Sequence, residues 1–155
     1  MENLKEYLGA HPFFNGLKPK QLDLLAGCAR DVGFQEGQYI HREGEAANHF
    51  YLIRQGRVVV EASSPPLGVL GLLTVAPGEI FGFHWLFPPY QWAFDYRAAE
   101  ATQALQVDGR CMRGECEQDH ELGYQLMWRF AEVLSKTLNA TRYQLLETIH
   151  ECSTD

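Results

Sequence analysis

Glycines that recur between short apolar segments constrain the fold of this chain more than any other feature of its sequence. They stand at positions 33, 37, 44, 56, 71, 78 and 82. Glycine adopts the positive φ angles that tight turns require, and short alternating segments between such turns are typical of an antiparallel sandwich or barrel. The clearest pair of strands covers residues 50–61, with a tight turn at Gln55 and Gly56. The sequence therefore predicts an antiparallel β-roll over residues 29–109.

Helices are predicted on both sides of this roll. Short N-terminal helices are expected within residues 1–28, a short helix at residues 110–118, and a long helix at residues 119–150. About thirty residues at about 1.5 Å each give a rod of roughly 45 Å. That length exceeds what a single domain of 155 residues needs for its own packing.

The long helix carries two apolar faces. Leu126, Phe130 and Val133 form one face, which we expect to pack on the roll. The other face follows alternating steps of four and three residues through Met127, Ala131, Leu134, Leu138, Thr141 and Leu145. This spacing favours a parallel two-helix seam, and hence a dimer, most simply a homodimer. A single broad core face remains the alternative.

Composition excludes several classes of protein. A net charge of −7 disfavours binding to nucleic acid, since 13 basic side chains stand against 20 acidic ones without clustering. No apolar run approaches the roughly 18 residues that span a bilayer, and the N-terminus does not resemble a signal peptide, so we expect a cytoplasmic protein without a membrane span. The four cysteines, Cys28, Cys111, Cys116 and Cys152, are too sparse for a disulfide scaffold, and we expect them to be reduced thiols.

Residues 77–97 are unusually aromatic. Nine of these twenty-one residues are aromatic or His, and three are proline. If the protein has a ligand site, we expect it here. The alternative is a bulky loop that plugs the end of a barrel.

An ordered set of residues resembles a known family. The set comprises Phe13, Phe14, Gly16, Leu17, Leu22, Leu25, Phe34, Gly37, Ile40, Glu43, Gly44, Glu45, Phe50, Tyr51, Ile53, Gly56, Val58, Val60, Pro77, Gly78 and Glu79. Together they resemble the cyclic nucleotide-binding domain of the catabolite activator and fumarate-nitrate regulator family. The resemblance implies an eight-stranded double-stranded β-helix, a jelly-roll-like β-roll, with helices at both ends. It also implies a non-catalytic regulatory module whose last helix dimerises.

The resemblance also locates the phosphate-binding cassette of the family. Its glycine corresponds to Gly82, and the Glu that holds the ribose is replaced by Phe83. The Arg that holds the cyclic phosphate falls at Gln91 or Trp92, just before Ala93. Because charge-assisted contacts of about 1.5–3 kcal/mol each are missing, ordinary cAMP or cGMP binding should be weak or absent.

Other residues complete the predicted site. Arg97 is the nearest positive charge, although it lies in the following strand, and Thr141, followed by Arg142, matches the helix position that contacts the base in the family. Aromatic side chains near Gly82, including His84 and Trp85, would line a cavity suited to a flat or hydrophobic ligand. The loop could equally fill the pocket, so the identity of any ligand stays open.

The sequence leaves three alternative functions to consider. The first is a genuine cyclic nucleotide-binding regulator with a non-standard pocket. The second is a cupin-like metalloenzyme using His41, Glu45, His49 and His84, which the missing His-x-His pair disfavours, so no metal or catalytic residue is expected. Haem on His84 is also disfavoured, and no cofactor is expected. Since the sequence ends five residues after His150, we expect no helix-turn-helix.

Overall fold

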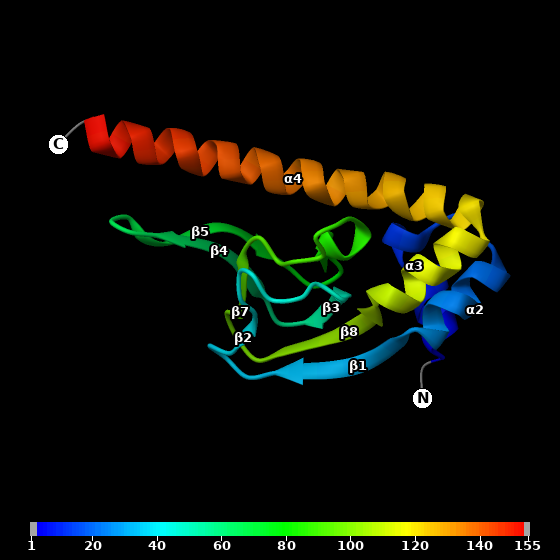
Figure 1. Ribbon diagram of the computed structural model, residues 1–155. Helices are drawn as coiled ribbons and strands as arrows, with labels where there is room; N and C mark the ends of the chain where they lie inside the picture. The colour runs from blue at the N-terminus through cyan, green and yellow to red at the C-terminus, as the bar shows by residue number, and fades with distance from the viewer. Residues whose placement is uncertain (1–2, 154–155) are drawn as a thin grey trace.

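The strands of the protein form two four-stranded antiparallel sheets that close into a β-roll (Figure 1). The structure is a computed structural model, which describes residues 3–153. One sheet has the order β1 (Ala29–Phe34), β8 (Thr102–Asp108), β3 (His49–Gln55) and β6 (Ile80–Phe81). The other has the order β2 (Tyr39–His41), β7 (Asp95–Ala98), β4 (Val58–Ser64) and β5 (Gly68–Val75). The predicted fold class is confirmed.

Helices pack at one end of the roll and along its side. The N-terminal group comprises α1 (Leu4–Ala10), the short helix η1 (Pro12–Phe14) and α2 (Pro19–Gly27). The predicted N-terminal segment begins at residue 1, so its first two residues lie outside the described part. After β8 come α3 (Gly109–Gln118) and α4 (His120–Ser153). Asp119 accepts a hydrogen bond of 3.1 Å from the backbone N–H of Leu122, which stabilises the start of α4.

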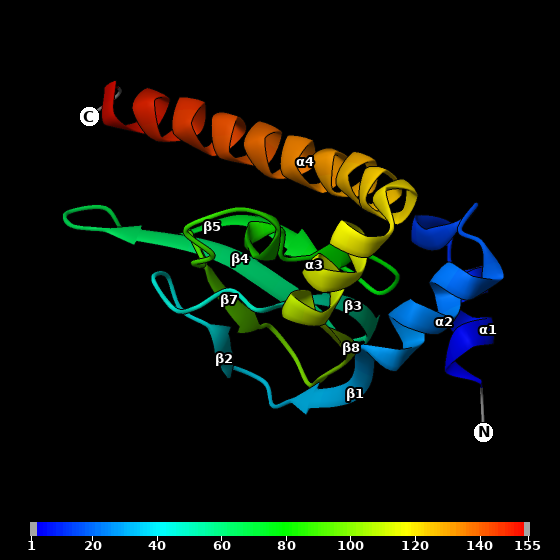
Figure 2. The ribbon, with the colours of Figure 1, turned by 45° about the vertical axis from the view of Figure 1, so that its right-hand side comes forward.

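The long helix α4 crosses the roll and extends beyond its middle, so that its C-terminal half runs over the hairpin of β4 and β5 (Figures 1 and 2). Leu126 and Phe130 are buried and Val133 is half-buried, as predicted for the face toward the roll. The side chains of Met127, Leu134, Leu138 and Leu145 are exposed. None of the helices in the described part of the chain is long and apolar enough to span a membrane.

Two apolar clusters make the core. One joins the helices to the sheet that contains β3. It is centred on Phe50, Trp85 and Phe130, whose rings contact one another at centroid distances of 4.9–5.3 Å. The other fills the interior of the roll and includes Tyr51 and Phe81, which stack at 4.8 Å. Alternate side chains of the strands point inward, which supplies this second cluster.

The prediction of four reduced cysteines is wrong for two of them. Cys28 and Cys111 form a disulfide with a Cα–Cα distance of 6.1 Å, although they are 83 residues apart in sequence. The cause is tertiary: β1 pairs with β8 so that Ala29 faces Val107, which brings the residue before one strand close to the turn after the other. Cys116 and Cys152 are free thiols.

Candidate functional site

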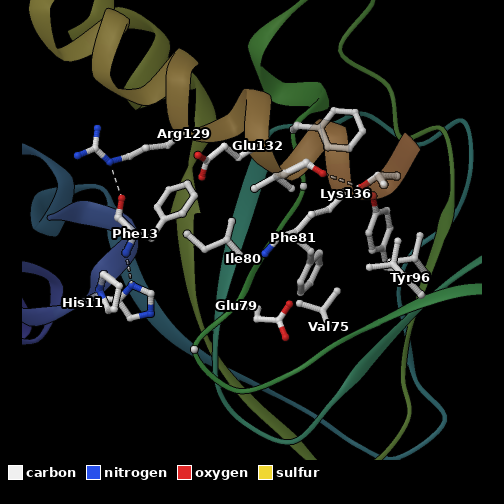
Figure 3. Close-up of a pocket in the computed structure, with 18 residues that line it drawn as sticks. His11, Phe13, Val75, Glu79, Ile80, Phe81, Tyr96, Arg129, Glu132 and Lys136 are labelled. Carbon is white, nitrogen blue, oxygen red and sulfur yellow. Dashed lines mark hydrogen bonds between the residues drawn. The ribbon is translucent and has the colours of Figure 1, made fainter. Parts of the chain in front are cut away.

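A cavity of about 290 Å³ lies between the mouth of the roll and α4 (Figure 3). Five segments build it: the turn before and within η1, the hairpin of β4 and β5, residues 78–83, Tyr96 of β7, and the middle of α4. Its lining residues are His11, Pro12, Phe13, Val60, Leu73, Val75, Gly78, Glu79, Ile80, Phe81, Gly82, Phe83, Tyr96, Arg129, Glu132, Val133, Lys136 and Thr137. Segments that are remote in sequence therefore meet at one site.

Apolar side chains make most of the wall. Val60 and Val75 point inward from paired strands, and Ile80 and Phe81 follow from β6. These side chains belong to the two clusters of the core, so the cavity is continuous with packed interior. A site of this kind gains binding energy mainly by removing apolar ligand surface from water.

Arg129 is fully engaged by the protein itself. Its guanidinium donates hydrogen bonds to the carbonyls of Phe13 and Asn15, and to the carbonyl of Gln125 at 2.9 Å and its side-chain oxygen at 2.6 Å. Burial lowers the pKa of Arg129. The side chain thus ties the N-terminal turn to α4 and offers a ligand little free hydrogen-bonding capacity.

The other charged groups lie at the rim. Glu79, Glu132 and Lys136 are exposed, and Figure 3 shows the first on the opposite side of the cavity from the two helix residues. His11 accepts a hydrogen bond from the N–H of Phe13 at 3.1 Å, and burial lowers its pKa, which favours the neutral ring. The deep part of the cavity is therefore apolar.

Gly82 and Phe83 are the two predicted site residues that line this cavity. Gly82 has a φ of +98°, and an ideal Cβ there would lie 2.8 Å from the six-membered ring of Trp92. Only glycine fits both the backbone angle and the close ring. Phe83, the predicted counterpart of the family's ribose-binding Glu, presents an apolar ring to the cavity.

Trp92 is not a cavity residue. It is 1% exposed and packs inside the roll, stacked on His41 at 4.4 Å and edge-on to Tyr96 at 4.9 Å. The residue that stands at the expected place of the phosphate-binding Arg is therefore part of the core. Its indole N–H is buried and has no hydrogen-bond partner within residues 3–153.

The remaining predicted cassette residues also lie away from the cavity. Trp85 packs between Phe130 of α4 and Phe50 of β3, whereas Gln91 and Ala93 are exposed. Arg97 donates two hydrogen bonds to the carboxylate of Glu61, at 3.1 and 3.2 Å. Burial lowers the pKa of His84.

On α4, the structure brings Thr137 rather than Thr141 to the cavity. The Thr137 hydroxyl donates to the carbonyl of Val133 at 3.0 Å, and the Thr141 hydroxyl donates to the carbonyl of Thr137 at 2.7 Å. Thr141 and Arg142 lie one turn further along, outside the lining. The missed residue had a signal, because Thr137 continues the roll-facing series of Phe130 and Val133 by one helical turn.

The residues considered as metal ligands do not come together at one site. His41 Nε2 lies 2.7 Å from the Tyr51 hydroxyl, and Glu45 accepts a hydrogen bond from the N–H of Arg42. Burial lowers the pKa of His41 to about 4. Across the described residues, no group of three or more His, Cys, Asp or Glu side chains is placed to hold a metal ion.

Comparisons with known proteins agree on one domain type. The family model described as "Cyclic nucleotide-binding domain" matches residues 32–119. A curated relative, the CRP-like cAMP-activated global transcriptional regulator of Mycobacterium tuberculosis, is 26% identical over 147 residues, covering 94% of this chain and 63% of its own length. The chain thus spans less than two thirds of that relative.

Solved structures agree as well. A protein of Geobacter metallireducens, described as cyclic nucleotide-binding, has a TM-score of 0.79 at 28% identity, with 88% of this chain and 99% of the other covered. The sensor domain of the transcriptional regulator DNR from Pseudomonas aeruginosa has a TM-score of 0.67 at 20% identity, with 84% and 92% covered. The second likeness concerns the fold alone.

Proposed function

Because this chain belongs to the cyclic nucleotide-binding domain family, we propose that it is a non-catalytic sensor module whose altered cassette does not bind cAMP or cGMP in the ordinary way. One observation carries the proposal: the Trp92 ring lies against Gly82, where the family's cyclic phosphate would need an Arg and free space. A phosphate monoanion placed there would lose hydration without gaining a cation. Phe83 further replaces the carboxylate that would hold the ribose.

The test is calorimetric titration of the purified protein with cAMP and cGMP. We expect no measurable heat of binding up to about 1 mM, which corresponds to less than about 4 kcal/mol of binding free energy. The cAMP-activated regulator of M. tuberculosis serves as the positive control for the titration. Micromolar binding of either nucleotide would contradict the proposal and favour a cyclic nucleotide regulator with a non-standard pocket.

We also propose that two copies of the module associate through α4. The exposed stripe supports this: Leu138 is 68% exposed and Leu145 is 58% exposed, and Met127, Ala131 and Leu134 extend the same stripe toward the N-terminal end. Two such stripes are self-complementary when the helices run parallel. A second copy of this chain is therefore the proposed partner.

The proposed setting is regulatory and cytoplasmic. A relative over most of this chain is named as a global transcriptional regulator, which points to a role in signalling. The net charge of −7 disfavours direct contact between this module and a phosphate backbone. We expect the module to act on partner domains or chains instead of on nucleic acid or membranes.

A further inference from the structure

The Tyr96 side chain is buried, and its hydroxyl makes no hydrogen bond to another described residue. Tyr96 is 2% exposed, and its ring packs against Phe81 at 5.1 Å. Within the described residues its hydroxyl makes no hydrogen bond, whereas the buried Tyr51 hydroxyl contacts His41 at 2.7 Å and Gln106 at 3.0 Å. Since Tyr96 lines the cavity, its hydroxyl is free to form a hydrogen bond with a ligand or a water molecule there.

This hydroxyl belongs to the wall of the cavity. Figure 3 shows the Tyr96 ring beside Val75 and directed toward α4, in the part of the cavity below Lys136. Burial raises the pKa of Tyr96, so the phenol stays protonated and can donate a hydrogen bond at neutral pH. The surrounding wall, including Val60 and Phe81, is apolar.

The charged groups around the cavity do not suit an anion. Arg129 is occupied by carbonyls and by Gln125, and the other cation, Lys136, is exposed at the rim near Glu132. A buried anion would therefore lose its hydration without a dedicated partner. An uncharged ligand has no such cost.

We propose that the cavity binds a small, uncharged and mostly apolar molecule with one hydrogen-bond acceptor, such as a carbonyl oxygen, that accepts the proton of the Tyr96 hydroxyl. A volume of about 290 Å³ suits a molecule of about two fused rings, at the lower end of ligand pockets. This inference rests on the proposed sensor function and gives its ligand class. It assigns to Tyr96 the specificity that the altered cassette does not supply.

The experiment uses three naphthalenes of nearly equal size: 2-acetylnaphthalene, 2-ethylnaphthalene and 2-naphthoate. Their dissociation constants are measured for the wild-type protein and for Tyr96→Phe by the change in probe fluorescence. We expect the wild-type protein to bind the ketone about three- to tenfold more tightly than the hydrocarbon, the effect of one neutral hydrogen bond. Naphthoate should bind at least about tenfold more weakly than the ketone, because it must be desolvated.

In Tyr96→Phe the preference for the ketone should disappear while the affinity for the hydrocarbon stays unchanged. Removing the ligand's carbonyl and the Tyr96 hydroxyl, separately and together, isolates the hydrogen bond between them. Val133→Trp should fill the cavity and abolish binding of ketone and hydrocarbon alike, since Val133 lines it. Val69→Trp is the matched control, because Val69 is 60% exposed on β5 and does not line the cavity.

The proposal is overturned by equal affinities for ketone and hydrocarbon in the wild-type protein, by tighter binding of naphthoate, by no binding of any probe, or by unchanged binding in Val133→Trp. Urea unfolding of each variant ensures that a lost signal does not come from a lost fold. A parallel cAMP titration tests the proposed function separately. Tight cAMP binding would contradict that function, whereas failure of the ketone series alone would remove only the ligand class.

Discussion

At the scale of single residues, two side chains of the predicted cassette pack against apolar neighbours. Trp92 packs against Gly82 and stacks on His41, and Phe83 turns an apolar ring to the cavity. In the proposed register, these residues replace charged ligand contacts by apolar packing, which stabilises the fold without requiring a ligand. Because Trp92 packs inside the roll, a substitution at this site also changes the stability of the roll.

Gly56 is the residue where the backbone tolerates substitution least. Its φ is +93°, and an ideal Cβ would lie 2.5 Å from the Ala101 carbonyl oxygen and 2.5 Å from Thr102 Oγ1. We expect Gly56→Ala to lower the free energy of unfolding by about 3 kcal/mol or more, because strain and overlap add. Urea denaturation measures this change.

Gly44→Ala is the control for that substitution. Gly44 has a similar φ of +91°, but nothing lies within 4 Å of an ideal Cβ there. It should cost only about 1–2 kcal/mol, the strain of the left-handed backbone alone. Equal losses for both variants would show that the overlap at Gly56 does not contribute.

His41 should make the stability pH-dependent. Burial lowers its pKa in the folded state from 6.5 to about 4. The unfolded state therefore takes up a proton first as the pH falls, and stability present above pH 6.5 is lost progressively down to about pH 4. Since His41 is only partly buried, we expect a loss of about 1–2 kcal/mol once solvent screening is allowed for.

The measurement is the free energy of unfolding in urea at several pH values between 4 and 7. His41→Gln keeps a polar side chain at this position but does not titrate, so its stability should fall less steeply over the same interval. His120→Gln is the control, because His120 is exposed. A His41→Gln slope identical to that of the wild type would contradict the role of His41.

At the scale of elements, α4 presents two faces with different tasks. Leu126 and Phe130 anchor the helix to the roll, and the face with Leu138 and Leu145 is left exposed. A helix of 34 residues spans about 51 Å, so it offers far more surface than one roll can cover. The exposed apolar stripe is the physical basis of the proposed dimer.

Leu138→Glu should dissociate that dimer. A parallel seam would bury Leu138 of both copies, each worth about 1.5–3 kcal/mol, so the dissociation constant should rise by about 100-fold or more. Sedimentation equilibrium measures it, and circular dichroism checks that the helix persists. Asn139→Glu adds the same charge at the next, exposed position and should leave association unchanged. A wild-type monomer at micromolar concentration would refute the dimer outright.

At the scale of the whole molecule, the disulfide joins two segments at one end of the sheet in which β1 pairs with β8. Cys28 follows α2 and Cys111 lies in the first turn of α3, so the bond joins the N-terminal helices to the segment that leads into α4. The loop closed by the bond contains all eight strands of the described residues. Closing so long a loop restricts the unfolded chain strongly.

The double variant Cys28→Ser with Cys111→Ser should therefore be less stable by about 2–5 kcal/mol in urea. Cys152→Ser is the control, since Cys152 is an exposed free thiol and its substitution should not change stability.

In the native wild-type protein, a thiol reagent should label Cys152 quickly and Cys116 slowly, because burial raises the pKa of Cys116 to about 11. Rapid labelling of Cys28 or Cys111 would contradict the disulfide.

Local patterns were enough to predict the elements. Turn glycines such as Gly56 mark the strands, and the period of α4 separates Leu126 from Leu138. Each of these depends on neighbours within a few residues along the chain. Hence the β-roll and the long helix could be predicted before the structure, and the altered cassette stays a prediction.

The tertiary structure alone decided where these side chains lie. Trp92 could have lined a cavity or filled the core, and only the approach of β7, β2 and residue 82 places it inside. The Tyr96 hydroxyl lies at a cavity only because α4 packs across this part of the roll. Thr137 and the bond between Cys28 and Cys111 follow in the same way from contacts between distant segments. Long-range packing is not encoded in any single stretch, so these features required the fold.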